Sequence, residues 1–158
     1  MDMLIVGLDG KGGPSSDLGG VGCTCTEYQT QMSMWCMFAS PLAMSHDLLD
    51  ENEATRRILL NKEMIAINQD ALGEAARRVD FPGVCRVYLR RLSGNRLALA
   101  VMNPSDKPQG IRLPLSVIGK AEKYVFRDVW EHKTTLRHKI WQGDLQPHET
   151  KVFTVTAR

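Results

Sequence analysis

The chain has 158 residues, a formal net charge of +2 and a charged fraction of 24%. This length allows one domain or two small ones, and so small a net charge without a basic tract excludes nucleic acid as the expected partner. No apolar run approaches the length of about 20 residues that crosses a bilayer, and no basic leader is visible, so we expect no membrane partner and a cytoplasmic location.

The four cysteines are Cys23, Cys25, Cys36 and Cys85. Cys36 lies in an apolar stretch, where a cysteine behaves as a small buried hydrophobic residue. Cys23 and Cys25 are too close for an easy local disulfide, and no second Cys or His pair stands at the spacing of a zinc site. We therefore expect free thiols in a reducing compartment, no metal and no cofactor.

The first segment, residues 4–6, is apolar and β-prone, and Gly7 opens a turn. The glycine-rich stretch that follows, to residue 22, is longer than most connections. It contains Gly10, Gly12 and Gly13, but no Walker lysine follows and no G-x-G-x-x-G pattern is in register. We interpret it as a loop at the mouth of a barrel and not as a phosphate cradle.

A helix is predicted from Thr24 to the residues before Pro41. Thr24 and Glu27 have the spacing of a capping box, and Pro41 cannot continue a helix. Apolar residues recur between them at helical spacing, which predicts packing against more than one neighbour: Tyr28, Met32, Trp35 and Ala39. A short apolar run, 42–44, then ends in Ser45, His46 and Asp47. A helix, a tight turn and a buried strand with polar residues at its end are typical of an α/β barrel.

A second helical region follows, with Asp50 and Glu53 as the expected cap pair. The helix runs to residue 59, residues 61–63 interrupt it, and Gly73 is the expected stop signal. We assign residues 1–73 to a partial barrel and residues 74–83 to a linker.

From residue 84 the pattern becomes strand-like, with turn signals roughly every ten residues, which indicates an antiparallel sandwich over residues 84–158. The predicted strands are 86–90, 96–102, 110–115, 123–130, 134–137, 139–142 and 150–156. The expected fold class is α+β: the last part of a (β/α)8 barrel followed by an antiparallel β-sandwich.

Four segments in order resemble one family: Asp2-Met3-Leu4-x-Val6-Gly7, Thr26-Glu27-Tyr28-x-Thr30-x-x-Ser33-x-Trp35, Ser40-Pro41-Leu42, and the run from Asn61-Lys62-Glu63 through Asn68-Gln69-Asp70 to Leu72-Gly73. They resemble the C-terminal part of glycoside hydrolase family 27, the α-galactosidases or melibiases of clan D, and the loop before the capping box is most similar to bacterial members. The resemblance implies removal of terminal α-linked galactose with retention, which uses two carboxylates about 5–5.5 Å apart.

Both catalytic carboxylates of that family belong to motifs that precede Asp-Met-Leu, so the resemblance implies no catalytic residue in this chain. It gives Asp2 and Met3 a substrate-contact role only. We expect the chain to be inactive by itself, with an α-galactoside as the substrate of the parent enzyme. The apolar faces of residues 4–6 and 28–38 would be covered by an upstream barrel half, by self-association or by the β domain.

An alternative is a non-catalytic module whose sandwich binds carbohydrate or a partner. Four aromatic residues could form a sugar-stacking platform, although alternating aromatics in strands are more often core: Tyr88, Tyr124, Trp130 and Trp141.

Two further groups of side chains are considered for chemistry. One acidic group could supply a new acid/base pair but is better explained as helix N-terminal charge: Asp47, Asp50, Glu51 and Glu53. The histidines have no nucleophile in register and receive no role: His46, His132, His138 and His148.

Overall fold

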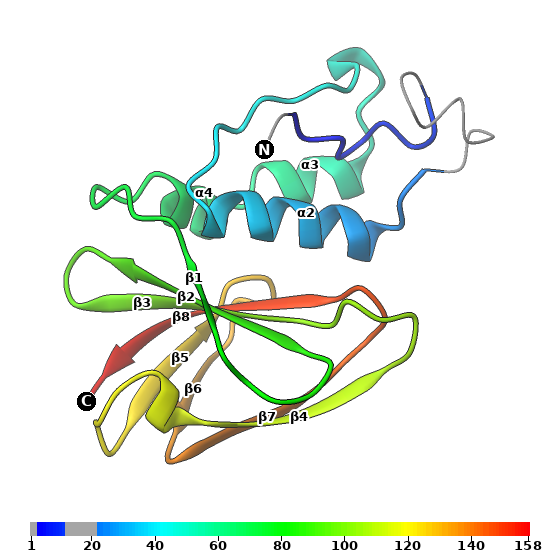
Figure 1. Cartoon of the computed structure of the whole chain (residues 1–158). Helices are drawn as coiled ribbons and strands as arrows, with labels where there is room; N and C mark the ends of the chain where they lie inside the picture. Colours follow the sequence, from blue (N-terminus) through cyan, green and yellow to red (C-terminus); the bar gives the residue numbers. More distant parts are fainter. Residues whose placement is uncertain (1–2, 12–21) are drawn as a thin grey trace.

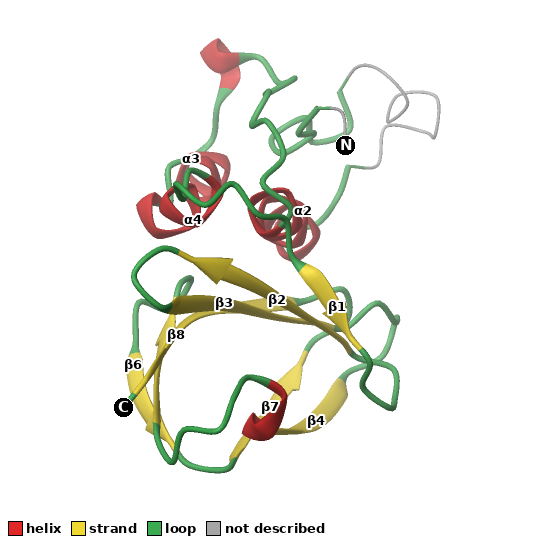
Figure 2. Ribbon diagram, turned by 60° about the vertical axis from the view of Figure 1, so that its left-hand side comes forward, coloured by secondary structure: helices red, strands yellow, loops and turns green. Residues whose placement is uncertain are grey.

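A computed structural model describes residues 3–11 and 22–158. Three helices cover one face of a six-stranded sheet, and a two-stranded sheet lies against its other face (Figure 1). Figure 2 shows this order of layers from the side. The fold is therefore α+β, as predicted. Within the described ranges, no helix has the length and apolar character needed to span a membrane.

Helix α2, Cys25–Met37, begins with the predicted capping box. The Thr24 hydroxyl accepts from the Glu27 backbone N–H, and the Glu27 carboxylate accepts from the Thr24 N–H at 2.7 Å. The helix ends two residues earlier than its apolar pattern suggests because Ala39 has a left-handed backbone, with φ of +53°.

Two short helices follow a 3₁₀ turn, η1, Leu48–Asp50. Helix α3, Glu53–Leu59, is capped by Asn52, whose side chain accepts from the Thr55 N–H, so the predicted Asp50 cap is wrong. Asn and Asp cap about equally well, and the cap belongs to the residue directly before the first helical turn. Helix α4, Lys62–Asn68, starts at the predicted interruption, with Asn61 as its cap.

The six-stranded sheet has the order β1-β2-β3-β8-β5-β6, and β4 pairs with β7 in the second sheet. Neighbouring strands are antiparallel throughout. Seven of the strands lie where the sequence predicts them, and the eighth, β1, lies within residues 74–83, the expected linker. Their bounds are β1 Arg77–Val79, β2 Arg86–Leu92, β3 Arg96–Met102, β4 Gln109–Pro114, β5 Tyr124–Asp128, β6 Thr134–Arg137, β7 Ile140–Leu145 and β8 Thr150–Ala157, with a 3₁₀ turn, η2, at Leu115–Val117.

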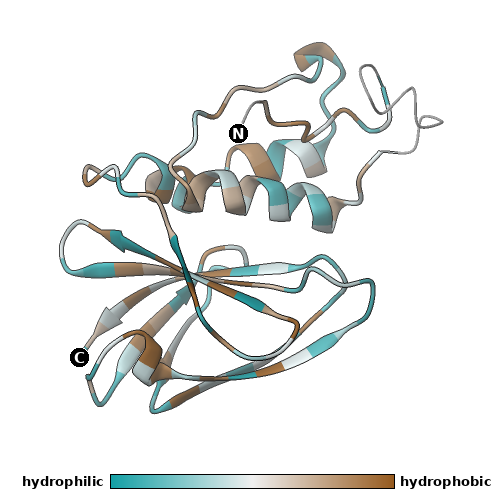
Figure 3. Ribbon diagram, in the orientation of Figure 1, coloured by the Kyte–Doolittle hydropathy of each residue, from teal (hydrophilic) through white to brown (hydrophobic). Residues whose placement is uncertain are grey.

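The centre of the large sheet is buried on both faces, which explains why β3 is apolar from Leu97 to Met102. Ala98 and Ala100 of β3 pack in a cluster with the helices, whereas Leu99 and Val101 pack in the core between the two sheets. The small side chains of Ala98 and Ala100 on the helix-facing side let the helices pack close to the sheet. Other strands alternate hydrophobic and hydrophilic positions along their length (Figure 3).

The sandwich covers the apolar face of α2. Tyr28, Met32 and Met37 of the helix belong to one buried cluster with Leu92 and Val152 of the sheet. Of the three ways to cover this face that the sequence leaves open, the β domain is therefore the one that the structure shows.

The predicted buried strand at residues 42–44 is wrong in its burial. The segment forms a single parallel bridge, between Leu4 and Met44. Ala43 and Met44 are exposed, whereas Leu4 and Val6 are buried. A parallel strand is covered only where neighbours lie on both sides, and in the described residues this pair has the helices on one side.

Candidate active-site rim

The parallel bridge brings two polar strand ends together. The Leu4 N–H donates to the Ala43 carbonyl at 2.7 Å, and the Ser45 N–H donates to the Leu4 carbonyl at 3.1 Å. The Ser45 hydroxyl donates to the same carbonyl at 2.6 Å. Both segments leave the bridge in the same direction, so residues 7–9 and 45–51 lie at the carboxyl ends of the pair. We call these two stretches the rim, because α/β barrels place their active sites at this end of the strands.

Asp9 connects the rim to two helices. Its backbone N–H donates to the Tyr28 hydroxyl of α2 at 2.8 Å, and its carboxylate accepts from the Asn52 side chain, the cap of α3, at 2.8 Å. Burial of Tyr28 raises the pKa of its phenol. The phenol therefore stays protonated near neutral pH, and this part of the rim is held by two side-chain hydrogen bonds.

His46 is a buried residue of the rim. Its side chain is 1% exposed, and its Nε2 lies 3.6 Å from Glu51 Oε1. Neither ring nitrogen has a hydrogen-bond partner within the described ranges. Gly7 lies against the same ring, because a Cβ at Gly7 would come within 3.1 Å of His46 and 2.6 Å of the Thr55 methyl. The rim thus packs directly on α3 with no room for a side chain at residue 7.

The acidic group at the rim has structural partners. Asp47 accepts from the Leu49 N–H at 2.9 Å, and Asp50 pairs with Lys11. The hydrogen bond from Lys11 lowers the pKa of the Asp50 carboxyl. Glu51 pairs with Arg56 at 3.2 Å. These contacts fit turn caps and surface ion pairs, as the helix N-terminus interpretation predicts, and not an acid/base pair.

Of the two residues predicted to contact substrate, Met3 lies within the described ranges. Asp2 lies outside the described residues. Met3 directly precedes the bridge strand and is 44% exposed. Its substrate-contact role stays a prediction. Within the residues that the structure describes, no group of three or more His, Cys, Asp or Glu side chains could hold a metal ion.

The four aromatic residues do not form the sugar-stacking platform of the alternative hypothesis, and the favoured interpretation of them as core residues is confirmed. Tyr124 and Trp141 are 3% and 4% exposed, and Trp141 packs edge-on against Phe153 with ring centroids 5.3 Å apart. Tyr88 and Trp130 are partly buried against the helices. Tyr88 and Trp130 pack against one hydrophobic core and Tyr124 and Trp141 belong to the other, so the four side chains share no surface.

A hollow of about 660 Å³ lies between the helices and the turn that joins β5 to β6. Two polar groups in its wall, Trp130 and Glu63, are already engaged. The Trp130 indole N–H donates to the Ser33 hydroxyl at 3.0 Å, and Glu63 accepts from Arg127 at 2.7 Å. The hollow is therefore part of the contact between helices and sandwich, and the rim remains the candidate site.

A barrel-type strand pair with its polar rim, packed on an antiparallel sandwich, defines the class: the closing part of a (β/α)8 barrel with a C-terminal β domain. Family models agree with this over both parts. The α-galactosidase A model matches residues 9–70, and the model of the α-galactosidase C-terminal β-sandwich domain matches residues 82–155. The chain belongs to the α-galactosidase or melibiase family, glycoside hydrolase family 27.

Comparisons with individual proteins agree with this family. The chain is 32% identical to α-galactosidase 2 of Arabidopsis thaliana over 145 residues, which are 90% of this chain and 37% of that protein. A Bacteroides fragilis structure named as an α-galactosidase/melibiase matches 98% of this chain and 33% of its own, with a TM-score of 0.87 and 35% identity. A family 27 β-L-arabinopyranosidase of Geobacillus stearothermophilus matches 99% of this chain and 37% of its own, with a TM-score of 0.83 and 25% identity. The chain therefore spans about a third of the length of these relatives.

Proposed function

We propose that this chain supplies the closing strand pair, the rim and the C-terminal sandwich of an enzyme that removes terminal α-linked galactose with retention. The observation that carries the proposal is the parallel bridge between Leu4 and Met44, whose carboxyl ends form a rim within a chain that both family models match. The Arabidopsis and Bacteroides relatives carry α-galactosidase names, which supports the same substrate class.

The two carboxylates of a retaining mechanism come, in this proposal, from barrel strands outside this chain. A nucleophile and an acid/base must be free to face the sugar at a separation of about 5–5.5 Å. At the rim, Asp50 and Glu51 are held by Lys11 and Arg56 instead. The contribution of this chain is to contact substrate through Asp2 and Met3 and to hold the rim in position.

We further propose that earlier barrel strands cover the outer side of the bridge. Apolar side chains are exposed on the segments around it: Met3, Met44, Leu48 and Leu49. A parallel pair in a barrel is flanked on both sides, so a further parallel strand would bury them. A second copy of this chain would bring no catalytic carboxylate, which is why the upstream half is the favoured occupant.

A chimaera tests the proposal. The part of the Bacteroides relative that matches this chain is replaced by residues 1–158, and hydrolysis of nitrophenyl α-galactoside and nitrophenyl β-L-arabinopyranoside is measured. We expect the chimaera to cleave the galactoside and Asp2→Ala in it to lower kcat/KM by about tenfold or more, which corresponds to loss of one substrate contact. Leu136→Ser, which changes an exposed side chain of β6 outside the rim, is the matched control and should leave kcat/KM within about twofold.

Two results would overturn the proposal. Robust galactoside hydrolysis by the 158-residue chain alone would show that its own residues perform the chemistry. A folded chimaera that cleaves neither substrate would show that this rim does not complete an active site of the family.

A further inference from the structure

Two turns of the sandwich reach the helices, and each carries a histidine with a left-handed backbone. His132 follows β5 and His148 precedes β8, with φ values of +55° and +58°. His132 Nδ1 lies 2.7 Å from Glu63 Oε1 in the first turn of α4, and His148 Nδ1 lies 2.7 Å from Glu27 Oε1 in the first turn of α2. Both contacts therefore join a turn of the β domain to the N-terminus of a helix.

The partners of the two glutamates differ. Glu63 also receives two hydrogen bonds from Arg127, at 2.7 and 3.1 Å, and so has a permanent cation beside it. Among the described residues, His148 is the only charged partner of Glu27. The charge of this histidine therefore decides whether Glu27 has a cationic partner across the contact.

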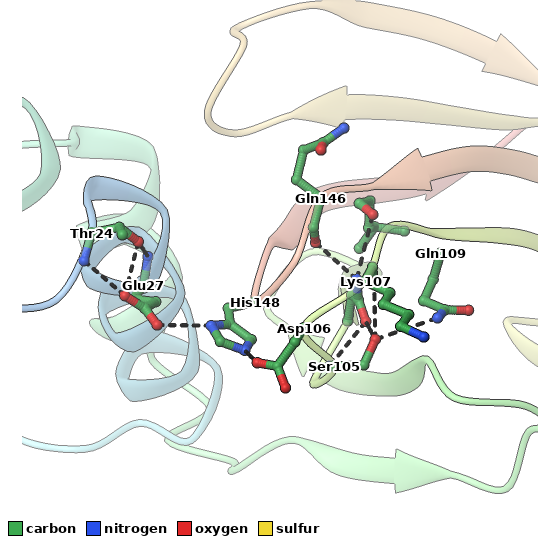
Figure 4. Close-up of polar contacts among 10 residues, drawn as sticks. Thr24, Glu27, Ser105, Asp106, Lys107, Gln109, Gln146 and His148 are labelled. Carbon is green, nitrogen blue, oxygen red and sulfur yellow. Dashed lines mark hydrogen bonds and ion pairs between the residues drawn. The ribbon is translucent and has the colours of Figure 1, made fainter.

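His148 lies between two carboxylates, as Figure 4 shows. In addition to the Nδ1 contact with Glu27, its Nε2 lies 2.9 Å from Asp106 Oδ1, on the loop between β3 and β4. A neutral imidazole has one N–H and one lone pair, so one ring nitrogen would turn a lone pair toward a carboxylate. Only the imidazolium donates to both, and this geometry selects the protonated ring.

Other hydrogen bonds hold the turn that carries His148. Thr30 of α2 donates from its hydroxyl to the His148 carbonyl at 2.6 Å, and its hydroxyl oxygen lies 3.1 Å from the Thr150 hydroxyl. Within the turn itself, Glu149 accepts from the Gln146 N–H and lies 3.9 Å from the Lys151 ammonium. The charged groups that face the ring are therefore Glu27 from α2 and Asp106 from the β3–β4 loop.

We propose that His148 is a proton-dependent latch that docks the β7–β8 turn on the N-terminal turn of α2. The hydrogen bond from Thr30 holds the backbone of the turn at every pH, so the proton changes the strength of the contact. Glu27 is next to Tyr28, whose hydroxyl accepts from the Asp9 N–H at the rim. The contact between His148 and Glu27 thereby holds the first turn of α2, whose Tyr28 binds Asp9 of the rim.

The two partners together set the pH range. Hydrogen bonds to Glu27 and Asp106 raise the pKa of His148 above 6.5. The protonated ring therefore stabilises the folded chain fully below about pH 6.5, and this stabilisation is lost as pH rises through the folded-state pKa. Hydrogen bonds from Thr24, and to a smaller extent from His148, lower the pKa of Glu27 below 4.5. The ionised Glu27 therefore stabilises the folded chain above about pH 4.5, and this stabilisation is lost as pH falls through the lowered pKa. The latch is strongest between about pH 4.5 and 6.5.

The test uses the 158-residue chain and the variant Glu27→Gln. Glutamine keeps the capping box, because its amide oxygen still accepts from the Thr24 N–H, and it replaces the charged acceptor that faces His148 by a neutral amide. Between pH 5.5 and 8, the Tm of the wild type should fall by about 2–4 °C more than that of Glu27→Gln. His138→Gln, which removes an exposed histidine in the turn between β6 and β7, is the control and should keep the wild-type pH dependence.

A double-mutant cycle separates the latch from a merely structural contact. Glu27→Gln, His148→Gln and the double variant should show coupling at pH 5.5 and none at pH 8. Equal coupling at both values, or no coupling at either, would overturn the proposal. If His148→Gln does not fold, the ring of His148 is titrated by NMR in the wild-type chain, where a pKa at or below 6.5 would overturn the proposal equally.

Discussion

Arg90 of β2 donates a hydrogen bond to the carbonyl of Cys36 in the last turn of α2. Its other terminal nitrogen donates to the Asn68 carbonyl, at the end of α4, at 3.3 Å. The side chain is almost fully buried, at 1% exposure, and burial lowers the pKa of the guanidinium. Carbonyls at helix C-termini lack intrahelical partners and carry partial negative charge, so one buried cation serves the ends of two helices.

Replacing Arg90 by alanine should lower the free energy of unfolding by about 2–4 kcal/mol, because it leaves a cavity and two carbonyls without their donor. Urea unfolding measures the change. The neighbouring Arg91 is the matched control: its side chain is 72% exposed and lies 3.7 Å from Glu74, so Arg91→Ala should change stability by less than about 0.5 kcal/mol. Similar losses at both positions would show that Arg90 does not support the helix ends.

Gly7 fixes how closely the rim approaches α3. Its φ is +87°, and an added Cβ would lie 2.6 Å from the Thr55 methyl. Gly7→Ala should therefore destabilise by about 2–3 kcal/mol, from backbone strain and overpacking together. Gly73→Ala, at φ of +62° with nothing within 4 Å of its Cβ, isolates the strain and should cost about 1 kcal/mol.

A second variant separates the two causes at residue 7. Thr55→Ser removes the methyl group and should recover part of the loss when combined with Gly7→Ala, as measured by thermal or urea unfolding. No recovery would mean that the close approach between rim and helix is not what limits residue 7.

The four thiols should divide into two classes. Cys23 and Cys25 are exposed, whereas Cys36 and Cys85 are buried, and burial raises the pKa of Cys36 to about 12. Because the thiolate is the reactive form, Ellman's reagent at pH 8 should modify two thiols in the native chain and four in denaturant. Mass spectrometry locates the labelled residues. Rapid native labelling of Cys36 would show that the contact between α2 and the sheet opens readily.

Local signals predicted the sandwich strands and the start of α2. Alternation and turn residues placed β3 and β6 at the residues where the structure has them, because strand period and turn chemistry are properties of neighbouring residues. The capping box of Thr24 and Glu27 formed as predicted for the same reason. The choice of Asp50 over Asn52 as a cap failed because both residue types cap well and only the path of the chain decides between them.

Contacts between distant residues could not be predicted. The alternating pattern of the strand predicts a solvent-facing side chain at Arg90, yet the packing of two helix ends over β2 buries it. The sequence favours a surface position for His46, yet its side chain is only 1% exposed in the fold. The histidines of two sandwich turns had no visible partner because Glu63 and Glu27 lie 69 and 121 residues away in sequence.

The sequence by itself determined the family, the order of the elements and the position of the cap that begins α2, since these depend on motifs and on periods over a few residues. Tertiary structure alone decided which face of the sheet receives the helices, that the sandwich covers α2, and which charges meet between them. These depend on distances between residues far apart in the chain, which packing fixes and local pattern does not contain.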